Sequence, residues 1–134
     1  MNDLAGFLLG QFGPTNYSDT TIFNMAKRRL KRFSVLALTE YMVESGVVLG
    51  AKLNWRVDGF GQRVVNSNGE ASQLVTDLKE LSAEDQAFVR YYVGVDTRLY
   101  HYAQCLLEKE YHHLTNRTWS SSPYEELDLF FQLN

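Results

Sequence analysis

The sequence predicts an α/β chain that is mainly helical and has one short strand, at residues 33–38. The strand is indicated by the continuous apolar run Val35-Leu36-Ala37-Leu38, which polar residues bound and which is typical of a strand covered on both faces. Helices are indicated on both sides of this run by apolar residues that recur every three or four positions. The 134 residues, 45% hydrophobic and 22% charged, suit one globular unit with a core.

Before the strand, a helix is predicted to begin at Asp19, Thr20 or Thr21, each of which can cap it. Its apolar positions are Ile22, Phe23, Ala26 and Leu30. Its other side carries the basic residues Lys27, Arg28, Arg29, Lys31 and Arg32. We interpret this basic run as a solvated helix face in preference to a phosphate contact, because charge runs of this kind are usually exposed.

After the strand, a second helix is predicted over residues 39–53. The Thr39 hydroxyl can accept a free backbone N–H of the first turn, and Glu40 places negative charge at the positive end of the helix dipole. Residues 58–69 contain three glycines among polar residues, and this composition predicts a loop.

The C-terminal half is predicted to form two more helices. Ser82 is the expected cap of the first, and Gly94 is expected to end it. The second, at about 95–110, presents the apolar stripe Leu99, Tyr102, Ala103 and Leu106. The tyrosines Tyr91, Tyr92, Tyr100 and Tyr102 are expected to pack in the core and not to form an aromatic surface, because they recur at helical spacing.

Charge and composition argue against several classes of partner. The net charge of −3 gives no reason to expect nucleic-acid binding, which depends on a basic surface. Cys105 is the only cysteine, so neither an intrachain disulfide nor a cysteine-rich metal site is predicted. Adjacent side chains on a helix diverge by about 100°, so His112 and His113 are not expected to share a metal ion. No apolar run reaches the roughly 18 residues of a membrane span, and no targeting signal is visible.

Short motifs follow one another in order along residues 2–110. Thr39-Glu40 comes directly after the apolar run, and Ser45 and Leu49 lie on the helix that follows. The other motifs are Asn2, Leu8 and Gly10; Ala26, Leu30 and Phe33; Leu53-Asn54-Trp55; Asn66-Ser67-Asn68; Leu81-Ser82-Ala83-Glu84; and Asp96-x-x-Leu99-Tyr100 with Tyr102-Ala103. In this order they resemble the carbohydrate sulfotransferases of the Golgi, the family that includes galactose-3-O- and heparan-sulfate 2-O-sulfotransferases.

The resemblance implies the C-terminal, mainly helical part of a P-loop-like sulfotransferase fold. Residues 1–113 would form a partial sulfotransferase-like domain, and residues 114–134 a C-terminal tail. The family transfers a sulfuryl group from 3′-phosphoadenosine 5′-phosphosulfate to a carbohydrate hydroxyl of a glycan or glycolipid, in the Golgi lumen, without a metal. Its glycine-rich donor loop and its catalytic base have no counterpart in this chain, so we expect them upstream. We assign no catalytic residue and expect the isolated chain to be inactive.

Donor contact is predicted in the loop that contains Arg63, Asn66 and Ser67. In the family, the corresponding segment folds over the donor nucleotide, and a guanidinium gives bidentate hydrogen bonds to phosphate. A surface loop with incidental polar residues accounts for the same sequence equally well.

A second hypothesis, from a different class, is a noncatalytic helical protein-interaction module.

Two glycosylation sequons, at Asn16 and Asn116, slightly favour a luminal origin. The acidic and aromatic segment 124–131 would either dock on the domain or meet a partner.

Overall fold

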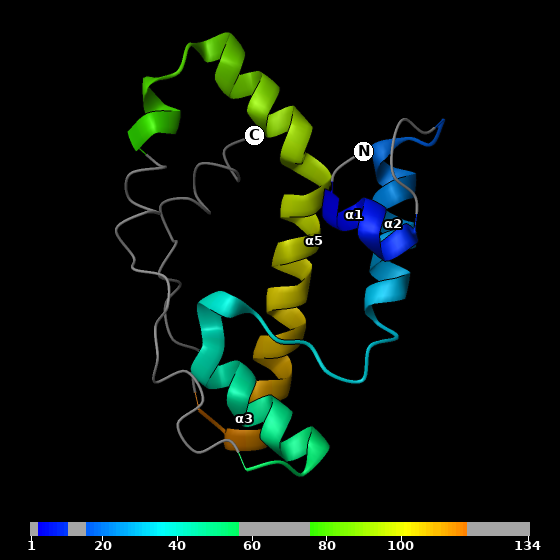
Figure 1. Cartoon of the computed structure of the whole chain (residues 1–134), viewed down its shortest axis with the longest axis vertical. Coiled ribbons are helices and arrows are strands. Elements are labelled where there is room, and N and C mark those ends of the chain that lie inside the picture. Colours follow the sequence, from blue (N-terminus) through cyan, green and yellow to red (C-terminus); the bar gives the residue numbers. More distant parts are fainter. Residues whose placement is uncertain (1–2, 11–15, 57–75, 118–134) are drawn as a thin grey trace. The chain divides into compact units, whose positions relative to one another are not determined.

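The computed structural model describes residues 3–10, 16–56 and 76–117, and this part of the chain is all-α (Figure 1). Of these residues 79% are helical and none lies in a strand, so the predicted α/β class with a strand at 33–38 is wrong for the described residues. The helices in chain order are α1 (Asp3–Leu9), α2 (Asp19–Leu30), the 3-10 helix η1 (Thr39–Tyr41), α3 (Met42–Leu53) and α5 (Ala83–Thr115). Residues 76–80 are helical as well.

The chain divides into two compact units, and α5 contributes to both. The first unit combines residues 1–33 with 81–103, and the second combines 34–80 with 104–134. The predicted boundary between a domain at 1–113 and a tail at 114–134 stays a prediction, because residues 118–134 lie outside the described part.

In the first unit, α1 is held at both ends by side chains of other helices. The Asp96 carboxylate of α5 accepts the backbone N–H groups of Leu4 and Ala5, at 3.0 and 2.9 Å. Arg29 Nη1 of α2 donates to the carbonyl oxygen of Leu8 at 2.9 Å. An isolated helix of seven residues is not stable in water, and its free terminal groups need partners. Side chains from α2 and α5 supply those partners.

Helix α2 forms as predicted, with a cap one residue earlier than expected. Ser18 is the N-cap, and its hydroxyl oxygen accepts the backbone N–H of Thr21 at 3.3 Å. The buried side chains are Ile22, Ala26 and Leu30, which confirms the predicted apolar side of this helix.

The predicted strand at 33–38 does not form, and residues 34–38 of the second unit make up a segment that lacks helix and strand and is extended at Leu38. Leu38 has φ −120° and ψ 133°, but its backbone N–H and C=O are both bonded to the Ser45 hydroxyl, at 2.9 and 3.1 Å. A strand exists only when a second strand supplies the ladder of hydrogen bonds, and the described residues contain none. One buried serine therefore satisfies the backbone N–H of Leu38, and it shares the Leu38 carbonyl with the backbone N–H of Tyr41, which lies at 3.1 Å.

The core of this unit collects residues from η1, α3, α5 and the extended segment. It contains Tyr41, Val48, Leu107 and Tyr111, with Val35, Leu38 and Val47 packed against it. Gln104 Nε2 of α5 donates to the Tyr41 hydroxyl at 2.9 Å. The apolar run therefore joins a core as its composition indicated, although its backbone is not paired in a sheet.

The predicted cap of the second helix is wrong, although the helix lies where it was expected. The N-cap position of η1 is Leu38, and no side chain caps it; Thr39 is exposed. At the other end, Asn54 takes the left-handed conformation with φ 53°. This conformation favours Gly or Asn, which explains physically why an asparagine ends α3.

Helix α5 is continuous from Ala83 to Thr115, so the predicted break at Gly94 is wrong. The predicted cap is confirmed, because the Ser82 hydroxyl accepts the backbone N–H of Asp85 at 3.1 Å. A glycine inside a helix costs only about 1 kcal/mol, which burial along the rest of a long helix outweighs. A Cβ built at Gly94 meets no atom within 4 Å, so close packing does not require glycine here.

Candidate functional site

The three residues predicted to contact the donor, Arg63, Asn66 and Ser67, lie outside the described residues. Ser45, the serine of the resembled strand–helix motif, is fully buried, and its hydroxyl is bonded to both the backbone N–H and the backbone C=O of Leu38. Ser45 is therefore a structural residue in this chain. Among the described residues, candidate functional features lie on the helix surfaces of the first unit.

The first feature is an exposed aromatic face at the start of α5, made of Phe88, Tyr91 and Tyr92. These side chains are 66%, 75% and 54% exposed. The prediction that the tyrosines pack in the core is therefore wrong for Tyr91 and Tyr92. The rings of Phe88 and Tyr92 stack, with centroids 6.2 Å apart and planes inclined by 21°. Because a helix turns about 100° per residue, positions 88, 91 and 92 lie on one side of α5.

The aromatic face continues the side of α5 that is buried further along the helix. Val95, Leu99 and Ala103 share this side and are buried in the first unit. Helix α1 attaches at Asp96, and the first turns of α5, drawn in green, extend beyond it (Figure 1). The side that forms the core from residue 95 onward is therefore exposed at Phe88, Tyr91 and Tyr92.

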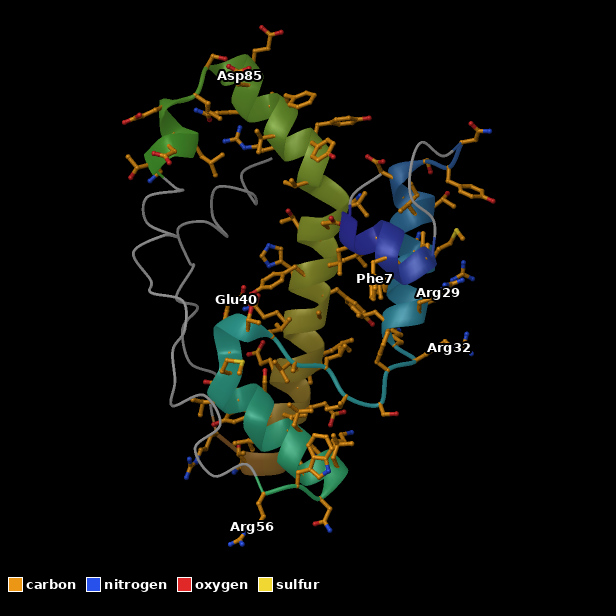
Figure 2. All side chains as sticks on the ribbon, viewed as in Figure 1. Phe7, Arg29, Arg32, Glu40, Arg56 and Asp85 are labelled. Carbon is orange, nitrogen blue, oxygen red and sulfur yellow. The ribbon has the colours of Figure 1, made fainter. Side chains whose placement is uncertain are left out.

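One exposed carboxylate lies in line with the aromatic face. Glu84, one turn before Phe88, is exposed and falls within the same arc of about 100°. Asp85, at the start of α5 in Figure 2, is used in the cap, since the Ser82 hydroxyl donates to its carboxylate at 2.6 Å. Arg90 lies on another side of the helix and donates to Gln86 Oε1 at 3.3 Å. The exposed aromatic face is thus flanked by negative charge.

The second feature is a row of alternating rings and cations where α2 meets α5, which we call the cation–π row. It consists of Phe23 and Lys27 on α2, Lys31 at the C-cap of α2, and Arg98 and Tyr102 on α5. Lys27 Nζ lies 4.5 Å from the centroid of Tyr102 and 5.7 Å from that of Phe23. Lys31 Nζ lies 5.9 Å from the Tyr102 centroid, and the Arg98 guanidinium carbon lies 5.0 Å from the Phe23 centroid. Two rings thus hold three positive groups.

Most basic residues at the C-terminal end of α2 and directly after it are exposed. Arg28, Arg29, Lys31 and Arg32 are exposed, in line with the predicted solvated face, whereas Lys27 is half-buried. Figure 2 shows Arg32 projecting to the side of α2 away from α5. The alternation of Phe23, Lys27 and Lys31 at intervals of four was visible in the sequence, but the partner helix was not.

The described residues contain no group of three or more His, Cys, Asp or Glu side chains placed to hold a metal ion. His112 Nδ1 lies 3.2 Å from the carbonyl oxygen of Arg117. Among the described helices, none combines the length and apolarity that crossing a membrane requires.

Comparison with known proteins gives no match: no family model, no curated protein and no solved structure matches this chain.

Proposed function

We propose that this chain is a noncatalytic helical protein-interaction module that binds a partner through the aromatic face of α5. The observation that supports this proposal is the exposure of Phe88, Tyr91 and Tyr92 on a side of α5 that is core elsewhere. Contiguous exposed apolar surface marks interaction sites, and aromatic residues supply much of the binding energy at protein interfaces. Burial by a partner removes from water the same kind of apolar surface that is buried further along α5 in the first unit.

The partner that fits this face is an apolar helix of another protein that also carries lysine or arginine. Glu84 lies beside the rings, and ring faces attract cations, each contact contributing about 0.5–1 kcal/mol at an exposed site. The same unit already shows this chemistry, since Phe23 and Tyr102 hold lysine and arginine side chains. An acidic partner would instead meet like charge at Glu84.

Selection from a displayed library of amphipathic helical peptides, with random charges on the polar side, tests this proposal. We expect the chain to select peptides that combine an apolar stripe with basic residues. The triple variant Phe88→Ser, Tyr91→Ser, Tyr92→Ser should bind the selected peptides at least about tenfold more weakly, since interface hot spots cost about 2 kcal/mol or more. Fluorescence anisotropy of labelled peptides measures the dissociation constants.

Two further variants make this test specific. Phe7→Ser removes another exposed aromatic side chain, 71% exposed and on α1, and should leave binding unchanged. Glu84→Lys should shift the selection away from basic peptides. Equal binding by the triple variant, or an equal loss in Phe7→Ser, would refute the role of the aromatic face.

The sulfotransferase function implied by the resemblance stays a prediction. Its donor, carbohydrate acceptor and Golgi location all depend on the family assignment, and the proposed donor contacts at Arg63, Asn66 and Ser67 lie outside the described residues. The strand with which the resemblance begins is not formed in this chain. The geometry of the described residues therefore favours the interaction module.

A further inference from the structure

We infer that the cation–π row is a binding site for an acidic segment of a protein, whose carboxylates pair with Lys27, Lys31 and Arg98. This site lies on the edge between α2 and α5 and is independent of the aromatic face. It adds a second, oppositely charged contact surface to the first unit.

The row has an excess of positive charge that the described side chains do not balance. In the described ranges, no salt bridge joins any of its three cations to a carboxylate. Asp19 is eight residues before Lys27 on α2, about 12 Å along the helix. Asp96 is close in sequence to Arg98, but its carboxylate oxygens accept the N–H groups of α1. An incoming carboxylate would therefore meet cations that still have capacity for a negative partner.

The rings hold these cations in place before any ligand arrives. Lys27 contacts both rings. Phe23 also contacts Arg98 of α5, and Tyr102 is itself on α5, so both rings tie a cation to the contact between the two helices. Long flexible side chains lose conformational freedom when they bind, so cations that are already ordered bind at a lower cost. Lys31 and Arg98 are exposed, so their outer sides are accessible to a partner.

The dimensions suit a short acidic run. From Lys27 to Lys31 the helix advances about 6 Å, and from Phe23 to Lys31 about 12 Å. An extended peptide advances about 3.3 Å per residue and alternates its side chains, so about four residues span the row. Two or three glutamate or aspartate side chains within such a segment match its three cations.

A protein segment fits better than a nucleic acid. Single strands bind by stacking bases on exposed aromatic rings, but lysine and arginine cover the rings of Phe23 and Tyr102. The net charge of −3 also repels a long polyanion, while a short acidic run contacts only the local positive edge.

Fluorescence anisotropy with the full chain and a labelled eight-residue peptide that contains four glutamates tests this inference. We expect binding that weakens as salt is raised, and at least tenfold weaker binding by the double variant Lys27→Gln, Lys31→Gln. The double variant Lys27→Arg, Lys31→Arg should restore most of the affinity. Lys109→Gln, an exposed lysine of the second unit, is the matched control and should change nothing.

Two more variants test the contribution of the rings and the independence of the two surfaces. Phe23→Leu keeps every charge but removes one ring, and should weaken binding severalfold while circular dichroism shows an intact helix content. The triple variant of the aromatic face should bind the acidic peptide normally, so this inference and the proposed function fail separately. The inference is overturned if Lys109→Gln weakens binding as much as the double glutamine variant does. Tighter binding of a single-stranded oligonucleotide with the same number of charges would overturn it equally.

Discussion

Replacing Ser45 by alanine is expected to destabilise the unit that contains α3 by about 1–2 kcal/mol, because the Leu38 N–H loses its bond to Ser45 whereas the Leu38 carbonyl still accepts the backbone N–H of Tyr41 at 3.1 Å. The Ser45 hydroxyl is fully buried, accepts the N–H of Leu38 at 2.9 Å and donates to the carbonyl of the same residue at 3.1 Å. Each buried backbone group left without a partner costs about 1–3 kcal/mol. Leu38 is half-buried, so water reaches it in part and the lower half of this range applies to its N–H, the one group that Ser45→Ala leaves without this partner.

Urea denaturation followed by circular dichroism measures this change in the free energy of unfolding. Ser34→Ala is the matched control, because Ser34 is exposed and lies in the same extended segment. Thr39→Ala serves as a second control, since Thr39 is exposed and no side chain caps η1; both controls should stay within about 0.5 kcal/mol of the unsubstituted chain. If Ser45→Ala also stays within that limit, the serine does not replace a strand partner and the reasoning is wrong.

Three further predictions address α5 and the donor site. Gly94→Ala should stabilise the chain by about 0.5–1 kcal/mol, because the position is helical and open; a lower melting temperature would show that this glycine is needed. Leu99→Ala should cost about 2–5 kcal/mol in urea denaturation, because Leu99 is fully buried, and an unchanged midpoint would contradict its place in the core. Calorimetric titration of 3′-phosphoadenosine 5′-phosphate should show little or no binding, because a principal phosphate loop is missing from the sequence; micromolar binding that Arg63→Ala removes would restore the sulfotransferase prediction.

The positions of α2, α3 and α5 could largely be predicted, because the spacing of apolar residues is a local signal, whereas α1 was not predicted and Ser82 is the one predicted cap that the structure confirms. The spacing of Ile22, Ala26 and Leu30 predicted the buried side of α2, and Ser82 was correctly identified as the cap of α5. The error at Gly94 has a clear cause, since a single unfavourable residue shifts local propensity by about 1 kcal/mol, which the burial of α5 side chains from Val95 onward outweighs.

The candidate surfaces were only partly predictable. Helical spacing placed Tyr91 and Tyr92 with the apolar residues of one side of α5, but it does not tell where along the helix that side is covered. In the same way, the spacing of Phe23, Lys27 and Lys31 shows that these residues share one side of α2. It does not show that Tyr102 and Arg98 lie opposite them.

The sequence by itself determined the short-range features of this protein: the positions of α2 and α3, the buried side of α2, the start of α5 at its Ser82 cap, and that residues 35–38 are apolar enough to join a core. Only the tertiary structure decided the conformation of that run and the exposure of the α5 rings. The physical reason is that a strand, a buried face and a cation–π contact each need a second group that is distant in sequence. For Leu38 that group was the hydroxyl of Ser45, and for Lys27 it was the ring of Tyr102.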